Sequence, residues 1–148
     1  AVFNVAYGVT ITPTASNSTF WLEANVSLGA SHTDHLSSLN FFDSQVGIAD
    51  GDEIFADTAE SSGDRILGAF PGNPFAVGAT LAYSLWGCHP SGLYTPASNN
   101  GSARTFYVCT KKNSQPHTSY LNYAAGDSSI NFAGTSNITV FEIANSII

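Results

Sequence analysis

Residues 1 to 28 alternate between apolar and polar side chains in two runs of opposite phase. The odd positions are apolar in the first run and the even positions in the second: Ala1, Phe3, Val5, Tyr7, Val9 and Ile11, then Phe20, Leu22, Ala24, Val26 and Leu28. A period of two residues is typical of a strand with one buried face. Between the runs, Pro13 and several Ser and Asn residues predict a hairpin-like turn. This stretch therefore predicts an antiparallel, β-rich fold.

Short apolar runs separated by Gly, Pro, Asn and Ser continue along the chain and predict further strands. These strands are expected at 39–42, 46–49, 53–56, 66–70, 77–86, 104–110, 119–123, 129–132 and 138–144. Residues 57–63 suit one or two helical turns, and residues 90–103 suit a surface loop. We therefore expect a single all-β domain over residues 1–148, which would be an antiparallel β-sandwich, a jelly roll or a β-barrel with long loops.

The charge balance excludes several classes of partner. Only 10% of the residues are charged, and 11 acidic against 4 basic residues give a net charge of -7. Nucleic acid is not expected as a partner, because phosphate binding needs a basic surface. The sequence holds no apolar run of the length that a membrane-spanning helix requires. It also lacks a phosphate-binding loop and a dinucleotide fingerprint, so we expect no cofactor.

Other features suit a secreted, extracellular glycoprotein. The sequence begins at Ala1 and contains no methionine, which a removed signal peptide explains most simply. Cys88 and Cys109 flank a loop-rich segment, and in an oxidising compartment a disulfide between them would contribute about 3 kcal/mol. Two buried free thiols are the alternative. N-glycosylation acceptors are present at Asn17, Asn25, Asn100 and Asn137.

A cluster of acidic residues raises the question of a bound cation. Seven of the eleven acidic residues lie between Asp43 and Asp64, and the calcium candidates among them are Asp50, Asp52 and Asp57. Calcium prefers several oxygen ligands from one flexible loop, but this spacing departs from the EF-hand pattern. A solvated acidic turn is the favoured interpretation, and no metal site is predicted.

Two glutamates lie on predicted strands, and glycoside hydrolysis usually needs a pair of facing carboxylates. Glu23 shares a strand face with Asn25 and would point outward. If Asn137 begins the last strand and faces solvent, Glu142 lies on the inner face, where its pKa would be raised unless the carboxylate is paired. A bulge or a preceding turn would change that phase. A hydrolase that uses Glu142 or the acidic segment therefore stays an alternative, and no catalytic residue is assigned.

Four residues are candidates for ligand binding. Trp21 lies on the polar face of its strand beside Glu23, where an exposed ring could stack on a sugar while the carboxylate accepts hydroxyl hydrogen bonds. Trp86 and Tyr94 belong to an aromatic group around the cysteines that suits either core packing or an apolar pocket. We expect a non-catalytic ligand-binding β-protein, with carbohydrate ahead of a small apolar molecule such as a pigment or lipid. A structural or interaction protein is a further alternative, and a homo-oligomer is compatible with all of these.

Overall fold

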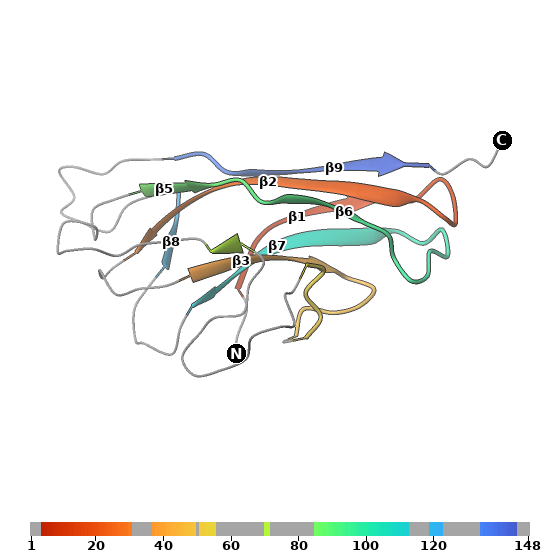
Figure 1. Cartoon of the computed structure of the whole chain (residues 1–148), viewed down its shortest axis with the longest axis horizontal. Coiled ribbons are helices and arrows are strands. Elements are labelled where there is room, and N and C mark those ends of the chain that lie inside the picture. The colour runs from red at the N-terminus through yellow and green to blue at the C-terminus, as the bar shows by residue number, and fades with distance from the viewer. Residues whose placement is uncertain are drawn as a thin grey trace.

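Two antiparallel β-sheets make up the regular structure in the computed structural model, which describes residues 4–30, 37–49, 51–55, 70–71, 85–112, 119–122 and 134–144 (Figure 1). The β1 sheet has the order β1 (Asn4–Ile11), β7 (Arg104–Lys112), β3 (Ser37–Asp43) and β4 (Phe70–Pro71). The β2 sheet is built around β2 (Thr19–Ala30), with β5 (Leu85–Cys88) and β6 (Ser91–Tyr94) along one edge and β8 (Ser119–Leu121) and β9 (Asn137–Ile143) along the other. The expectation of an all-β, antiparallel fold is confirmed.

The described segments contain no helix, and their two sheets do not close into a barrel. Within these segments there is accordingly no apolar helix of the length needed to cross a membrane. The expected helical turn at 57–63 lies outside the described residues.

The first two strands do not form the expected hairpin. β1 pairs with β7, whereas β2 pairs with β5, β6, β8 and β9. Residues 12–18 therefore lead from one sheet to the other, and the apolar sides of both strands contribute to a core between the sheets. Alternation fixes which residues share a face, but it does not determine the strand with which each run pairs.

The main hydrophobic cluster lies between the two sheets. β2 contributes all five of its predicted apolar residues, β3 contributes Leu39 and Phe41, and β7 contributes Phe106 and Val108. The rings of Phe20 and Phe106 meet across the sheets with their centroids 5.0 Å apart. Each such side chain contributes about 1.5–3 kcal/mol when it is fully buried, so this cluster is the principal source of stability among the described residues.

A β-bulge changes the predicted phase at the start of β1. The register with β7 shifts between Val5 and Tyr7, so that Tyr7 and Val9 pack against the core as expected. Val5 was expected on the same buried face, but its side chain is 49% exposed. The extra residue at Ala6 reverses the direction of the preceding side chain, which is the usual effect of a bulge.

The other strand predictions had mixed outcomes. Strands at 39–42, 104–110 and 138–144 are confirmed within one or two residues, and β8 matches the first part of 119–123. Residues 46–49 form a turn instead of a strand, because Val46 N and Gly47 N both donate to the carbonyl of Asp43. The described part of 53–56 is likewise a turn. The predicted loop at 90–103 contains β6, while 66–69, 77–84 and 129–132 lie outside the described residues.

The expected disulfide between Cys88 and Cys109 is not present in the structure. Cys88 belongs to β5 and packs against the core between the sheets. Cys109 belongs to β7, where its neighbour Val108 points into the same core, and it packs with Phe42 and Tyr107 in a second cluster on the outer side of the β1 sheet. The two sulfur atoms are therefore on different sides of a sheet and cannot meet without moving the backbone.

Candidate ligand-binding faces

An exposed apolar row crosses the outer face of the β2 sheet. The register places Trp21 of β2 directly between Leu93 of β6 and Phe141 of β9. Directly paired residues in antiparallel strands point to the same side of a sheet, so these three side chains share one face. Leu93 is 57% exposed and Phe141 is 56% exposed, while Trp21 is half-buried. We call this set the Trp21 row.

Glu23 lies beside the Trp21 row on the same face of β2. The indole Nε1 of Trp21 donates a hydrogen bond of 3.3 Å to Oε2 of Glu23. The residues paired with Glu23 are Ser91 on β6 and Thr139 on β9. This face therefore offers apolar surface, an oriented carboxylate and neutral hydroxyl groups together, but the positions paired with Glu23 supply no second carboxylate.

The other two predicted ligand residues do not join Trp21 and Glu23. Tyr94 lies on the inner face of the β2 sheet, where it packs against the core and donates a hydrogen bond of 3.2 Å from its hydroxyl to Oδ2 of Asp43. Burial raises the pKa of Tyr94, and the nearby carboxylate of Asp43 raises it further. Trp86 of β5 pairs in register with Leu28 of β2, but the Trp86 side chain is outside the described part of the structure.

A buried ion pair that the sequence did not indicate connects this inner region to the β1 sheet. Asp43 at the end of β3 and Arg104 at the start of β7 form a salt bridge, with side-chain exposures of 0% and 1%. The Arg104 guanidinium also donates to Oε1 of Gln45 at 3.0 Å and to the carbonyl of Ser98 at 2.8 Å. Together with the bond from Tyr94, these contacts tie both sheets and two loops together at one end of the molecule.

Glu142 lies on the inner-facing side of β9, in phase with Ile138 and Val140, which is the arrangement that follows when Asn137 begins the strand and faces solvent. Its Oε1 accepts three hydrogen bonds, from the backbone and hydroxyl of Thr14 at 2.7 and 3.0 Å and from the hydroxyl of Ser18. The bond from Ser18, with those from Thr14, lowers the pKa of Glu142. The carboxylate is therefore paired and anchors the connection between β1 and β2, and the raised pKa considered for an unpaired group does not apply.

The acidic segment forms a turn in which the described carboxylates bind backbone groups. Asp52 accepts a hydrogen bond of 2.9 Å from the backbone of Ala49, and Glu53 accepts one of 2.7 Å from Gly51. The other two calcium candidates, Asp50 and Asp57, lie outside the described residues. Over the ranges that the structure describes, no three His, Cys, Asp or Glu side chains are grouped so that they could hold a metal ion.

All four glycosylation acceptors are exposed: Asn17, Asn25, Asn100 and Asn137. Two of them lie opposite each other, because Asn25 of β2 pairs with Asn137 of β9. They occupy the outer face of the β2 sheet, the same face as the Trp21 row. The alternation of the sequence indicated that Asn25 was exposed, but it did not indicate that Asn25 and Asn137 were neighbours.

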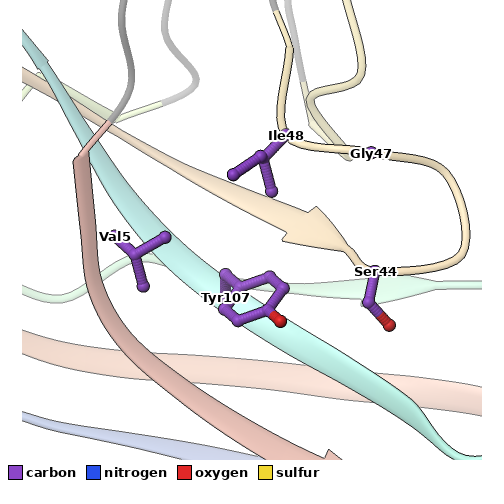
Figure 2. Close-up of a pocket in the computed structure, with 5 residues that line it drawn as sticks. All are labelled: Val5, Ser44, Gly47, Ile48 and Tyr107. Carbon is purple, nitrogen blue, oxygen red and sulfur yellow. The ribbon is translucent and has the colours of Figure 1, made fainter.

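A hollow of about 280 Å³ lies on the outer face of the β1 sheet (Figure 2). It is lined by Val5 of β1, Tyr107 of β7, and Ser44, Gly47 and Ile48 of the turn after β3. Figure 2 shows Val5 and Ile48 on two sides of the Tyr107 ring. The sequence pattern did not predict this hollow, because it does not reveal the bulge that turns Val5 outward.

Comparisons with known protein families, with curated proteins and with solved structures found no match to this chain. The functional inference therefore depends on the geometry of the two outer faces.

Proposed function

We propose that the chain is a secreted, non-catalytic glycoprotein in which the two sheets form a β-sandwich and the Trp21 row binds carbohydrate. The observation that carries the proposal is the alignment of Leu93, Trp21 and Phe141 across three neighbouring strands. The two flanking side chains are more than half exposed, although single apolar residues of this size usually gain by burial.

The shape and chemistry of this row suit the flat, apolar side of a sugar ring. Aromatic rings present a large surface with a negative face, which attracts the polarised C–H groups of a sugar. Neighbouring strands are about 4.8 Å apart, so a row across three strands extends over about 10 Å. That length favours an oligosaccharide with successive ring faces over a single monosaccharide.

Glu23 supplies the polar part of the proposed site. Its carboxylate already accepts the Trp21 indole hydrogen at 3.3 Å, and a carboxylate has further lone pairs that can accept ligand hydroxyl groups. The paired residues Ser91 and Thr139 carry hydroxyl groups that can donate or accept. A neutral, hydroxyl-rich ligand fits this set better than an anionic one, since Glu23 is the charged group of the site.

The positions of the carboxylates favour binding over hydrolysis. Glu23 faces hydroxyl-bearing residues, whereas glycoside cleavage usually needs a second carboxylate across the substrate. The hydrogen bonds to Glu142 lower its pKa, which opposes the protonated state that a general acid needs at neutral pH.

The proposal is tested with Trp21→Ala and Phe141→Ala, using a glycan array followed by titration of the best soluble oligosaccharide. We expect each substitution to weaken binding at least tenfold, which corresponds to about 1.4 kcal/mol. Val46→Ala is the matched control, because Val46 is 58% exposed and lies on the turn after β3, outside the strands that carry the Trp21 row. Absence of binding to every glycan, or equal binding by the wild type and Trp21→Ala, would contradict the proposal.

An interaction between two copies of the chain is the alternative use of the same row. An exposed apolar strip can be buried in a homo-oligomer, which would make the protein a structural or interaction module. Native mass spectrometry over a range of concentrations separates the two cases. A dimer that Phe141→Ala dissociates would favour the interaction module, whereas a monomer that retains glycan binding favours the carbohydrate site.

A further inference from the structure

The hollow on the β1 sheet forms a second candidate site, independent of the Trp21 row. We propose that it binds a compact, uncharged and mostly apolar molecule that carries one hydroxyl or carbonyl oxygen. Its lining combines the side chains of Val5, Ile48 and Tyr107 with Ser44 and Gly47 of the turn after β3 (Figure 2). The proposal goes beyond the carbohydrate function, since it concerns the other sheet and a different class of ligand.

Local backbone features hold the Tyr107 wall of the hollow in place. Gly8 of β1 is paired with Tyr107 of β7. A Cβ atom at Gly8 would lie only 2.8 Å from the Tyr107 ring, so the ring occupies the space that a side chain at this position would need. On the same strand, the bulge turns Val5 outward to form the adjacent wall.

The turn after β3 forms the opposite wall and is held by several hydrogen bonds. Val46 N and Gly47 N each donate to the Asp43 carbonyl at 2.9 Å. Gly47 has a φ of 145°, which strains any residue with a side chain, and a Cβ atom here would also force the Asp52 carboxylate to move, so glycine suits this position. Because Asp43 is itself held by the buried ion pair, the wall is formed before any ligand binds, which reduces the entropic cost of binding.

The size of the hollow limits the ligand. The hollow of about 280 Å³ lies just below the range of about 300–1,000 Å³ that is typical of sites for drug-sized ligands, so it suits a smaller organic molecule. Val5 is 49% exposed and Ile48 is 44% exposed. A ligand that covers them gains the hydrophobic free energy that the fold leaves unused at these two side chains.

Polar groups at the hollow define the remaining chemistry of the ligand. Ser44 Oγ accepts a hydrogen bond of 2.8 Å from Thr105 N, which leaves the hydroxyl hydrogen of Ser44 to donate to a ligand oxygen. None of the five lining residues is charged, and the Asp52 carboxylate lies beside Gly47. An anionic ligand such as a fatty acid would therefore meet no cation among the lining residues and would be repelled by Asp52.

The test uses 2-naphthol as a fluorescent probe at pH 7, with naphthalene and 2-naphthoate as matched comparisons. We expect saturable binding of 2-naphthol at one site and at least tenfold weaker binding of 2-naphthoate, because its carboxylate meets no cation. Ser44→Ala should weaken the binding of 2-naphthol severalfold and leave the binding of naphthalene unchanged. Val5→Asp, which adds charge, and Val5→Trp, which fills the hollow, should each weaken 2-naphthol at least tenfold.

Val46→Asp is the control for an added carboxylate on an exposed apolar residue of the same turn, because Val46 does not line the hollow and is 58% exposed. It should bind 2-naphthol like the wild type, and thermal unfolding of every variant should confirm that it is folded. Unchanged binding in both Val5 variants, or no saturable binding to the wild type, would overturn the proposal. If Trp21→Ala abolished 2-naphthol binding, the probe would bind at the Trp21 row of the β2 sheet, and this result would also overturn the proposal. No sugar enters this assay, so its failure is distinct from failure of the carbohydrate proposal.

Discussion

The buried ion pair of Asp43 and Arg104 allows a quantitative prediction of how its removal changes the stability of the fold. Both side chains are almost completely buried, so replacing one leaves the other charge in the interior without its partner. Removal of one member of a buried ion pair costs about 3–5 kcal/mol. For a chain of this length that cost corresponds to a decrease of roughly 6–20 °C in the melting temperature. We therefore expect Asp43→Leu and Arg104→Met each to lower the free energy of unfolding by about 3–5 kcal/mol.

The double variant distinguishes this mechanism from a general loss of packing. Asp43→Leu combined with Arg104→Met removes both charges, so neither is left unpaired in the interior. The hydroxyl of Tyr94 and the backbone amide of Gln45, which donate to the Asp43 carboxylate at 3.2 and 3.0 Å, would still lose their acceptor. At about 1–3 kcal/mol for each lost hydrogen bond, the double variant stays less stable than the wild type, but its total cost is expected to be well below the sum of the two single-variant costs.

The assay is equilibrium unfolding in urea at neutral pH, followed by circular dichroism, for the wild type and all three variants. Glu23→Gln is the control for loss of one carboxylate at an exposed position, and it should change stability by less than about 0.5 kcal/mol. Single-variant costs below about 1 kcal/mol, or costs that add in the double variant, would refute the reasoning, because either result means that the two charges do not depend on each other.

Further predictions concern titration, thiol reactivity and a turn. Hydrogen bonds from Ser18 and Thr14 lower the pKa of Glu142 in the fold, so its contribution to stability is present above the ordinary glutamate pKa of 4.5 and is lost as the pH falls through the folded pKa; acid unfolding of Glu142→Gln should lack this component. Burial raises the pKa of Cys109 to about 12 and also raises that of Cys88, so mass spectrometry should find both alkylated after unfolding without reductant, and Cys109 unmodified in the native protein. Gly47→Ala should lower the melting temperature measurably, because its Cβ would collide with Asp52.

The phase of β2 could be predicted from the sequence because alternation is a local property. The even positions from Phe20 to Leu28 are buried, and Trp21 and Glu23 face outward, as expected. The same argument failed at Val5, since a bulge depends on the partner strand and leaves no mark in the alternation of β1. The local pattern therefore predicted the sheet face on which a side chain lies, but it did not predict the register between paired strands.

Contacts between distant segments could not be predicted from the sequence pattern, which is local. Asp43 and Arg104 are separated by 61 residues, and each by itself resembles an ordinary polar residue at a strand end. The disulfide prediction failed for a related reason, because the chain-entropy argument considers only the loop between Cys88 and Cys109. It takes no account of the sheet face on which each thiol lies.

Register also links the proposed glycans to the proposed carbohydrate site. Asn25 and Asn137 face each other, and moving along the two strands leads first to Glu23 and Thr139 and then to Trp21 and Phe141. A glycan at either acceptor would therefore start on the same face as the Trp21 row, four residues away, and its sugars could lie along the row or beside it. The chain's own glycan and an external oligosaccharide would then compete for one apolar surface. If the row binds an oligosaccharide as proposed, glycans on Asn25 and Asn137 should weaken that binding, and the glycosylated and deglycosylated proteins are expected to differ in ligand affinity even with identical folds.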